Sequence, residues 1–177
     1  MGITFGTLTE TPLGEISFYA GDNGLRRVAF TTLDVLKKTD DIEEIRPSLT
    51  GLETIGILLT ELNEYLFGIR KSFSVKIDLT SIGEFQRQVL NMTAEIPYGQ
   101  VRTYGELAKE LGKPGASRAV GSALGSNPMP IVIPCHRVIG SDGGLRGYTD
   151  GIQTKAFLLS LEGHVVESGK VTKVLEH

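Results

Sequence analysis

Pro134-Cys135-His136-Arg137-Val138 holds the only cysteine of the chain, and the rest of the second half is arranged around it. The apolar segment 127–133, Asn-Pro-Met-Pro-Ile-Val-Ile, leads into it. Prolines fix their own φ angles and restrict the residue before each one, so this approach is stiff. A stiff approach suits a nucleophile held in one place. The alternative is a buried, inert cysteine at the end of a strand, because free cysteine is among the most buried residue types.

The neighbours of Cys135 favour the reactive interpretation. A thiol becomes a strong nucleophile only as thiolate, and a free cysteine has a pKa of roughly 8.5. The charges of His136 and Arg137 can favour the anion, and the imidazole can accept the thiol proton directly or through a water. We therefore expect a nucleophilic cysteine assisted by a histidine.

Composition excludes several classes of protein. The 177 residues are 40% hydrophobic and 22% charged, an ordinary globular composition. A single cysteine excludes an internal disulfide and a multi-thiolate metal site. No apolar run approaches the length of a membrane span, so we expect a cytosolic, soluble protein. A net charge of −3 does not by itself suggest nucleic acid, although residues 111–141 contain no acidic side chain.

The first half is predicted to be a small α/β scaffold over residues 1–79. Residues 52–67 repeat leucine and isoleucine at helical spacing, and 31–50 is a polar connection with some helix. This half contains neither cysteine nor histidine, and no catalytic constellation is visible in it. The predicted strands are Ile3–Thr9, Gly14–Tyr19, Leu25–Phe30 and Phe73–Leu79.

The second half, residues 80–168, is predicted to be mostly helical. The final segment, 169–177, is predicted to be a tail that ends in an expression-vector remnant at 175–177. Two short helices joined by a glycine-containing turn at 112–115 have the helix-turn-helix form. The predicted elements are a helix capped by Thr80 or Ser81 with Glu84, helices Tyr104–Leu111 (capped by Thr103) and Arg118–Gly125 (capped by Ser117), a strand Ile131–Ile133 and a helix Gln153–Leu161.

The helix predicted at 118–125 is rich in small residues and starts with Arg118. Small residues let the backbone approach a partner closely, and two partners are open. One is a neighbouring helix of the same protein. The other is nucleic acid, reached by the N-terminal amides of the helix. Base-by-base readout needs several long polar side chains, which this helix lacks.

Taken together, these residues resemble the O6-alkylguanine-DNA alkyltransferase (methylated-DNA–protein-cysteine methyltransferase) family over about 80–165. The resemblance lies in an ordered series of motifs rather than in a lone Cys-His pair. The motifs are Ile-Pro-Tyr-Gly-Gln-Val-Arg-Thr-Tyr-Gly-Glu-Leu-Ala at 96–108, Arg-Ala-Val-Gly-Ser-Ala at 118–123, Asn-Pro at 127–128, Pro-Cys-His-Arg-Val at 134–138, Gly-Tyr-Thr at 147–149 and Lys-Ala-Phe-Leu-Leu-Ser-Leu-Glu-Gly at 155–163.

The resemblance implies a stoichiometric reaction in which Cys135 takes the alkyl group from guanine O6 by in-line displacement. His136 then matches the base that deprotonates the thiol through a water, and Glu162 the carboxylate that orients that histidine. Asn127 matches a residue that ties its turn to the active-site segment. Tyr104 matches the donor to guanine N3 as negative charge leaves O6.

The resemblance also implies a way of handling double-stranded DNA. The lesion lies inside the base stack, so the nucleotide must be extruded through the minor groove, and Arg118 matches the arginine that fills the gap. The extruded base would meet Val138, Thr149, Tyr148 and Arg137. The other expected DNA contacts are Thr103, Tyr104, Ala119, Gly121, Ser122 and Ala123.

For the whole chain the resemblance implies a ribonuclease-H-like α/β domain followed by a winged-helix domain with a helix-turn-helix. We expect a monomer without a cofactor, and cooperative binding along DNA stays open. Relatives that bind zinc in the first domain use cysteine and histidine, which residues 1–79 lack, so no metal is expected. Arg146 replaces a small or hydroxyl residue common in the family and Asp150 a common glycine, whereas Lys155 is expected to be a surface lysine.

Three other functions stay open at this point. A damage-sensing protein would bind alkylated DNA and transfer nothing, although relatives of that kind lack the acceptor cysteine. A transcription regulator would use the helix-turn-helix without needing Cys135, Glu162 and Tyr104 in register. A thiol hydrolase would need turnover and an oxyanion hole, of which the sequence gives no sign.

Overall fold

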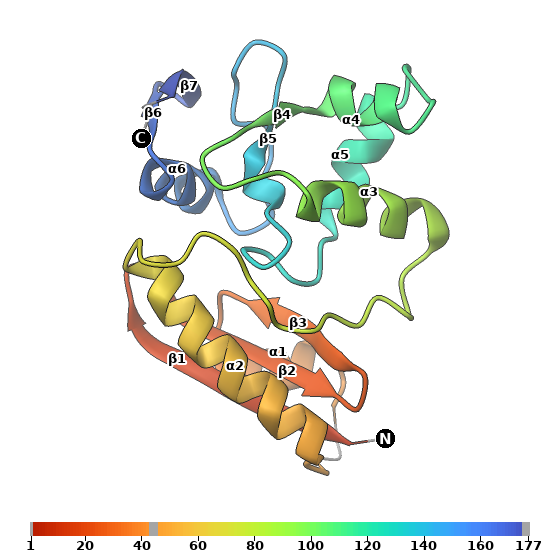
Figure 1. Ribbon diagram of the computed structural model, residues 1–177, viewed down its shortest axis with the longest axis vertical. Helices are drawn as coiled ribbons and strands as arrows, with labels where there is room; N and C mark the ends of the chain where they lie inside the picture. The colour runs from red at the N-terminus through yellow and green to blue at the C-terminus, as the bar shows by residue number, and fades with distance from the viewer. Residues whose placement is uncertain (1, 43–45, 175–177) are drawn as a thin grey trace. The chain divides into compact units, whose positions relative to one another are not determined.

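The computed structural model describes residues 2–42 and 46–174. The chain divides into two compact units, Met1–Ser81 and Ile82–His177. Both units combine helices and strands, so the fold is of mixed α/β type (Figure 1). Over the described ranges, none of the helices is long and apolar enough to cross a membrane.

The first unit is built on a three-stranded antiparallel sheet in the order β1-β2-β3. The three strands predicted from the sequence are confirmed, each with slightly different ends. In the register, Phe5 pairs with Tyr19 and Tyr19 with Arg27, so these side chains form one row across the sheet. The strands are β1 (Ile3–Thr11), β2 (Gly14–Gly21) and β3 (Gly24–Ala29).

Helices cover both faces of this sheet. The helix α2 (Leu49–Leu66) crosses one face (Figure 1), where a Cβ at Gly6 would lie 2.4 Å from the Phe18 ring and 2.7 Å from Ile55. Only glycine leaves room for that contact. The helix α1 (Leu33–Thr39) lies on the opposite face, because successive side chains of a strand alternate and Lys37 stands over the ring of Phe5.

The segment predicted as a strand at 73–79 is an exception. It makes only an isolated bridge, between Ile77 and Leu25 of β3, rather than a regular strand. The buried carboxylate of Glu61 explains this, because it accepts hydrogen bonds from the backbone N–H groups of Ser74 and Val75. Backbone donors that pair with a side chain are not available to a neighbouring strand.

The second unit begins with three helices, and α5 packs on both α3 and α4. The capping box predicted for α4 is confirmed, since the Thr103 hydroxyl accepts from Glu106 N–H and the Glu106 carboxylate accepts from Thr103 N–H. The other two predicted caps are wrong, because the N-cap of α3 is Gly83 and that of α5 is Ala116, and neither makes a side-chain capping hydrogen bond. The helices are α3 (Glu84–Ala94), α4 (Tyr104–Glu110) and α5 (Ser117–Gly125).

The remainder of the second unit carries the cysteine. A short 3₁₀ turn, η1 (Cys135–Arg137), leads into β5 (Val138–Ile139), which pairs in parallel with β4 (Arg102–Thr103). The helix predicted at 153–161 is confirmed as α6 (Ile152–Leu161).

Two expectations for this part differ from the structure. The predicted strand at 131–133 is reduced to one bridge between Pro130 and Ile133, because the prolines at 128, 130 and 134 have no N–H for a ladder. Most of the expected tail at 169–177 is strand β7 (Lys170–Val174), paired with β6 (His164–Glu167). Residues 175–177, the expected vector remnant, lie outside the described residues.

Candidate active site

Cys135 lies at the first position of η1, with only 6% of its surface exposed. Its N–H donates to the carbonyl of Ile133 at 2.8 Å, which closes the turn into the site. Just upstream, Ile131 has a φ of +71°, a conformation that is costly for a β-branched residue. The proline-rich approach thus holds the backbone in a strained course beside the thiol.

Asn127 fixes this approach through three hydrogen bonds. Its Nδ2 donates to the carbonyl of Ile133 at 2.9 Å and to the Cys135 Sγ at 3.0 Å, and its Oδ1 accepts from the N–H of Met129 at 3.0 Å. The side chain therefore ties the turn after α5 to the cysteine, as expected for this position, and it also touches the sulfur itself.

The surroundings of the thiol differ from those expected from the sequence. Burial raises the pKa of Cys135, while hydrogen bonds from Asn127 and Tyr148 and the charge of Lys155 favour the thiolate and the charge of Asp150 disfavours it. The side chains of the sequence neighbours His136 and Arg137 instead pair with a carboxylate. The sequence predicted that these two charges act on the sulfur, but the positive charge that favours the thiolate is that of Lys155.

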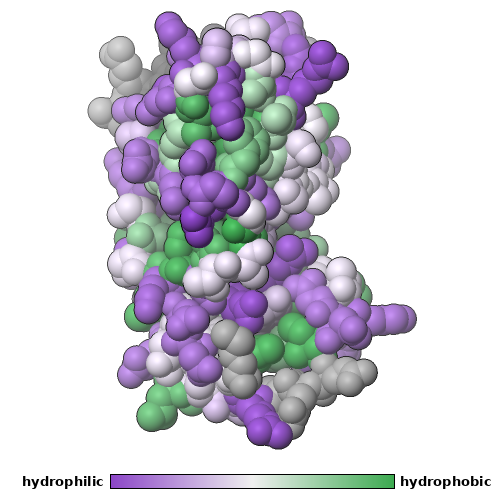
Figure 2. Space-filling model, turned by 90° about the vertical axis from the view of Figure 1, so that its right-hand side faces the viewer, coloured by the Kyte–Doolittle hydropathy of each residue, from purple (hydrophilic) through white to green (hydrophobic). Residues whose placement is uncertain are grey.

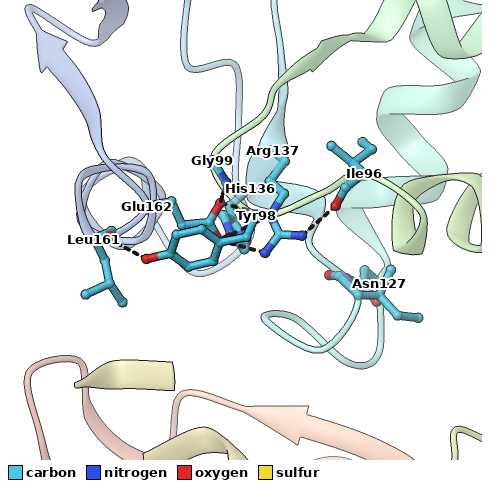
Figure 3. A network of polar contacts seen from close by, with 9 residues as sticks. Ile96, Tyr98, Gly99, Asn127, His136, Arg137, Leu161 and Glu162 are labelled. Atoms are coloured by element: carbon cyan, nitrogen blue, oxygen red, sulfur yellow. Dashed lines mark hydrogen bonds and ion pairs between the residues drawn. The ribbon is translucent and has the colours of Figure 1, made fainter. Parts of the chain in front are cut away.

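The carboxylate is Glu162, which follows α6 and is almost completely buried. Its Oε1 lies 2.9 Å from His136 Nε2, and its Oε2 accepts from the N–H of Gly99 at 3.1 Å. Arg137 donates to both oxygens of Glu162, from Nε at 2.9 Å and from Nη2 at 2.8 Å, and also to the carbonyl of Ile96 (Figure 3). One carboxylate thus joins η1, α6 and the loop before β4.

This network sets the protonation of its members. Burial alone would raise the pKa of Glu162, but the hydrogen bonds from His136 and Arg137 outweigh it and hold that pKa far below its usual range. Burial lowers the pKa of His136 although Glu162 acts in the opposite direction. At neutral pH the histidine is therefore neutral, and donation from Nε2 to Glu162 leaves the lone pair on Nδ1.

Arg137 does not occupy the place predicted for it. It was expected at the extruded base, whereas it is 5% exposed and its guanidinium is committed to Glu162 and Ile96. A buried carboxylate is costly without a paired charge, which explains why the arginine is used here.

Lys155 belongs to the site, and the prediction that it is a surface lysine is wrong. It is 1% exposed, and its Nζ donates to the carbonyl of Val138 at 2.6 Å and lies 3.5 Å from the Tyr104 hydroxyl. The ammonium also stands near the rings of Tyr104 and Tyr148. Burial lowers its pKa to about 8, so it is mostly protonated at pH 7.

A signal for this burial was present in the sequence. Lys155 shares one face of α6 with Leu158, Leu159 and Glu162, at the i, i+3, i+4 and i+7 spacing of a buried helix face. A lysine in such a row faces the core.

Tyr104, the first residue of α4, is half-buried. Burial and the charge of Cys135 raise the pKa of its hydroxyl, and the charge of Arg146 lowers it. The phenol is thus protonated at neutral pH and able to donate a hydrogen bond beside the thiol. Thr103, one residue earlier, uses its side chain to cap α4.

The outer face of α5 carries the small residues predicted to meet DNA. Arg118, Ala119 and Ser122 are exposed and Gly121 is half-buried, whereas Ala123 is 7% exposed. Ala119, Ser122 and Ala123 line an open depression with the first turn of α3. In the space-filling view, pale and light green residues of this unit lie among purple, hydrophilic ones (Figure 2). The depression is open, and α5 contributes only small side chains to it.

The loop between β5 and α6 closes the other side. The Thr149 hydroxyl donates to the carbonyl of Gly125, the last residue of α5, so the loop is tied to that helix. Val138 is buried, and its carbonyl is taken by Lys155. Within residues 2–42 and 46–174, no group of three or more histidine, cysteine, aspartate or glutamate side chains is arranged to hold a metal ion.

Comparison with known proteins gives a consistent result. Residues 84–164 match the family model described as the DNA binding domain of 6-O-methylguanine DNA methyltransferase. A methylated-DNA–protein-cysteine methyltransferase of Methanosarcina acetivorans is 44% identical over 154 residues, which cover 87% of this chain and 95% of that protein.

Solved structures agree in fold over nearly the whole chain. The crystal structure of the Mycobacterium tuberculosis O6-methylguanine methyltransferase superposes with a TM-score of 0.75 at 35% identity, covering 90% of this chain and 92% of that one. A structure of Mycobacterium tuberculosis OGT in complex with DNA gives a TM-score of 0.73 at 36% identity, with coverage of 89% and 91%.

Proposed function

The chain belongs to the methylated-DNA–protein-cysteine methyltransferase family, and we propose on that basis that Cys135 is its alkyl acceptor and O6-alkylguanine in DNA its substrate. The protein binds DNA and repairs it by alkyl transfer. One observation carries the assignment of the acceptor. The family transfers the alkyl group to a protein cysteine, and this chain has a single cysteine, which accepts a hydrogen bond from Asn127 and whose thiolate the charge of Lys155 favours.

The reaction is a single displacement. His136 takes the proton of the Cys135 thiol through a water, and Glu162 stabilises the imidazolium that forms. The thiolate attacks the alkyl carbon, the S–C bond forms as the C–O6 bond breaks, and the electron pair leaves with guanine. The product is a thioether, which has no route back to the thiol, so each molecule reacts once.

The leaving guanine needs a hydrogen-bond donor, and the surroundings of the Tyr104 hydroxyl support that role for it. Its hydroxyl is protonated, lies next to the Lys155 ammonium and is within the field of Cys135. As charge leaves O6, the phenol donates to guanine N3 and the nearby cation stabilises the developing anion. Lys155 also favours the thiolate before transfer, so one cation serves both ends of the reaction.

In this proposal DNA contacts the outer face of α5, where the exposed side chains are mostly small. A helix with small side chains at Ala119 and Ser122 can enter the narrow minor groove, where sequence information is degenerate. Arg118, exposed in the first turn, would fill the gap left by the extruded nucleotide. The base would then lie between Tyr104 and the loop that carries Tyr148 and Thr149. This suits a protein that reads damage rather than sequence.

The finer description of the fold is also proposed. The sheet β1-β2-β3 with its helices supports a ribonuclease-H-like first domain, and α4, α5 and the following strands support a winged-helix second domain. In this assignment the first unit is a scaffold and the second carries both DNA binding and chemistry. We propose that the protein acts as a monomer without a metal.

Intact-protein mass spectrometry tests the assignment most directly. The full chain is incubated with a duplex oligonucleotide that carries one O6-methylguanine. We expect one added methyl group per protein, mapped to the Cys135 peptide and saturating at that level. The Cys135→Ala variant should gain no mass and should still bind the lesion duplex, because the thiol contributes little to DNA contacts.

Three results would contradict parts of the proposal. Mass gain in Cys135→Ala would rule out this acceptor. Binding of the lesion by the wild type without any mass gain would indicate a damage sensor. Repeated turnover with one protein molecule would rule out a stable thioether.

A further inference from the structure

The loop after β5 places a second arginine at the rim of the site. Arg146 lines a depression of about 410 Å³ together with Tyr104 and Arg118. Ser117, Gly121 and Gly147 complete its wall. Two guanidinium groups on the wall of one depression indicate an anionic ligand. The arginine of α5 already has a proposed role, whereas Arg146 has none.

The loop backbone and Asp142 hold the Arg146 guanidinium group in one orientation. A Cβ at Gly140 would lie 2.9 Å from its Nε, and one at Gly144 would lie 3.2 Å from its Cζ, so these glycines leave room for the guanidinium on the loop backbone. Asp142 Oδ2 accepts from Arg146 Nη2 at 2.7 Å, and Asp142 Oδ1 accepts from Gly144 N–H. The cation is therefore oriented before any ligand arrives, which lowers the entropy cost of binding.

The charged groups around the Arg146 guanidinium favour the binding of an anion. Arg118 and Lys170 add positive charge, and Asp142 is the negative group in contact with Arg146, with Lys170 Nζ 3.7 Å from its Oδ2. The Arg146 side chain is 61% exposed. Asp142 takes one of its five N–H groups through Nη2, so a fork of donors still faces solvent.

Two anionic groups could meet Arg146, a backbone phosphate of the nucleotide or a charged alkyl group on guanine O6, and the location of Arg146 favours the phosphate. The charges that act on the Cys135 thiol are Lys155 and Asp150, whereas the charge of Arg146 acts on the Tyr104 hydroxyl. Arg146 lines the depression together with Tyr104, and Cys135 is not part of that lining. If the base enters beside Tyr104, the charged backbone of its nucleotide stays outside, on the side where the Arg146 side chain is 61% exposed.

We propose that Arg146 binds a backbone phosphate of the extruded nucleotide and so stabilises the flipped state of the lesion. The proposal rests on the function proposed above. It assigns to this chain a charged contact with two parallel donors, which a side chain without a guanidinium group could not make. Guanidinium and phosphate match in a bidentate geometry, so the contact is specific as well as electrostatic.

The salt dependence of binding measures this contact. Arg146→Ser is compared with wild type by fluorescence anisotropy on a duplex with one O6-methylguanine and on the undamaged duplex, over a range of NaCl concentrations. With the lesion duplex, the slope of log K against log [NaCl] should become shallower by about 0.9, the value for one lost phosphate contact. The undamaged duplex should show less change, because its nucleotides stay stacked. Arg146→Lys keeps the charge and should recover part of the slope.

Arg102→Ser is the matched control. Arg102 is likewise an arginine with a partly exposed side chain paired with a carboxylate, its Nη2 lying 2.8 Å from Glu110 Oε2. At 100° per residue, Glu106 and Glu110 lie on the side of α4 opposite Tyr104. This variant makes the same change in net charge and should leave the slope unaltered.

The outcomes separate this proposal from the one it rests on. Methyl transfer by the wild type is measured in parallel by mass, and its absence would overturn the function whatever Arg146 does. Normal transfer with an unchanged slope in Arg146→Ser would overturn the phosphate contact alone. An unchanged slope with slower repair of O6-carboxymethylguanine, relative to O6-methylguanine, would overturn it too and would assign Arg146 to the alkyl group.

Discussion

At the scale of the residue, the site is organised by charges that lie apart in the sequence. The thiol of Cys135 is buried, which raises its pKa, and the groups that counter this come from Asn127, Tyr148 and Lys155. The adjacent His136 and Arg137 instead pair with Glu162. Glu162 orients the histidine for proton transfer, burial keeps it neutral by lowering its pKa, and a lysine supplies the positive charge near the thiol.

Lys155→Met should test that division of roles. Methionine keeps the length of the buried side chain and removes the cation, so the pKa of Cys135 should rise and its reactivity at pH 7.5 should fall by about tenfold, the effect of one pKa unit. The rate of Cys135 alkylation by iodoacetamide, followed by intact mass between pH 6 and 10, measures this directly.

The control for this experiment is Lys109→Met, since Lys109 is an exposed residue on α4. It should react as the wild type does. An unshifted pH profile in Lys155→Met, with normal thermal stability, would show that the cation does not act on the thiol.

At the scale of the element, each secondary structure has a local cause and a separate task. The capping box of Thr103 and Glu106 fixes the start of α4 and thereby the position of Tyr104. The small residues of α5 let it pack on α3 and α4 while its outer face stays shallow. Both alternatives that the composition of α5 left open, tight packing and a surface for DNA, are compatible in one helix.

Ser122→Leu should separate these two tasks. Ser122 is exposed, so the free energy of unfolding should change by less than about 0.5 kcal/mol. A bulky side chain on the outer face should block entry into the minor groove and weaken DNA binding by about tenfold or more, measured by fluorescence anisotropy.

Ser160→Leu makes the same exchange at an exposed position of α6 and should bind DNA normally. Equal binding by Ser122→Leu and wild type would place the DNA on another surface.

At the scale of the whole molecule, the second unit buries several titratable groups in one core. Burial lowers the pKa of His136 and of His164, and neither ring nitrogen of His164 has a hydrogen-bond partner within the described part of the chain. Hydrogen bonds depress the pKa of Glu162. The folded state therefore resists taking up protons that the unfolded chain accepts.

The stability should consequently fall as the pH is lowered. The unfolded histidines bind protons as the pH drops through about 6.5, while the folded ones stay neutral to a lower pH, so stability is lost from that point downward. The depressed pKa of Glu162 adds a further loss below its unfolded value of about 4.3. The melting temperature measured from pH 8 to 4 should therefore decline below pH 7.

His164→Phe isolates one contribution. It removes a titrating ring without breaking a described hydrogen bond, so the melting temperature should decline less between pH 7 and 5 than in the wild type. A decline as steep as that of the wild type would show that the pH dependence arises elsewhere.

The sequence by itself determined the three strands of the first sheet, the main helices and the identity of the chemistry. Strand alternation, helical spacing and the Thr103 capping signal act over a few neighbouring residues, so they can be read from the chain. The single cysteine and the ordered motifs around it indicated the family. The prediction failed where a distant side chain takes the hydrogen bonds that a strand would need. At 73–79 the carboxylate of Glu61 accepts from the backbone N–H groups, so no regular strand forms.

Only the tertiary structure decided which side chains meet. Sequence adjacency suggested that Arg137 acts on the thiol or the base, but a buried Glu162 needs a partner and takes it. Lys155 was expected at the surface, yet its place on the inner face of α6 brings it to Val138 and Tyr104. Burial and charge pairing depend on residues far apart in the chain, and folding alone brings those residues together.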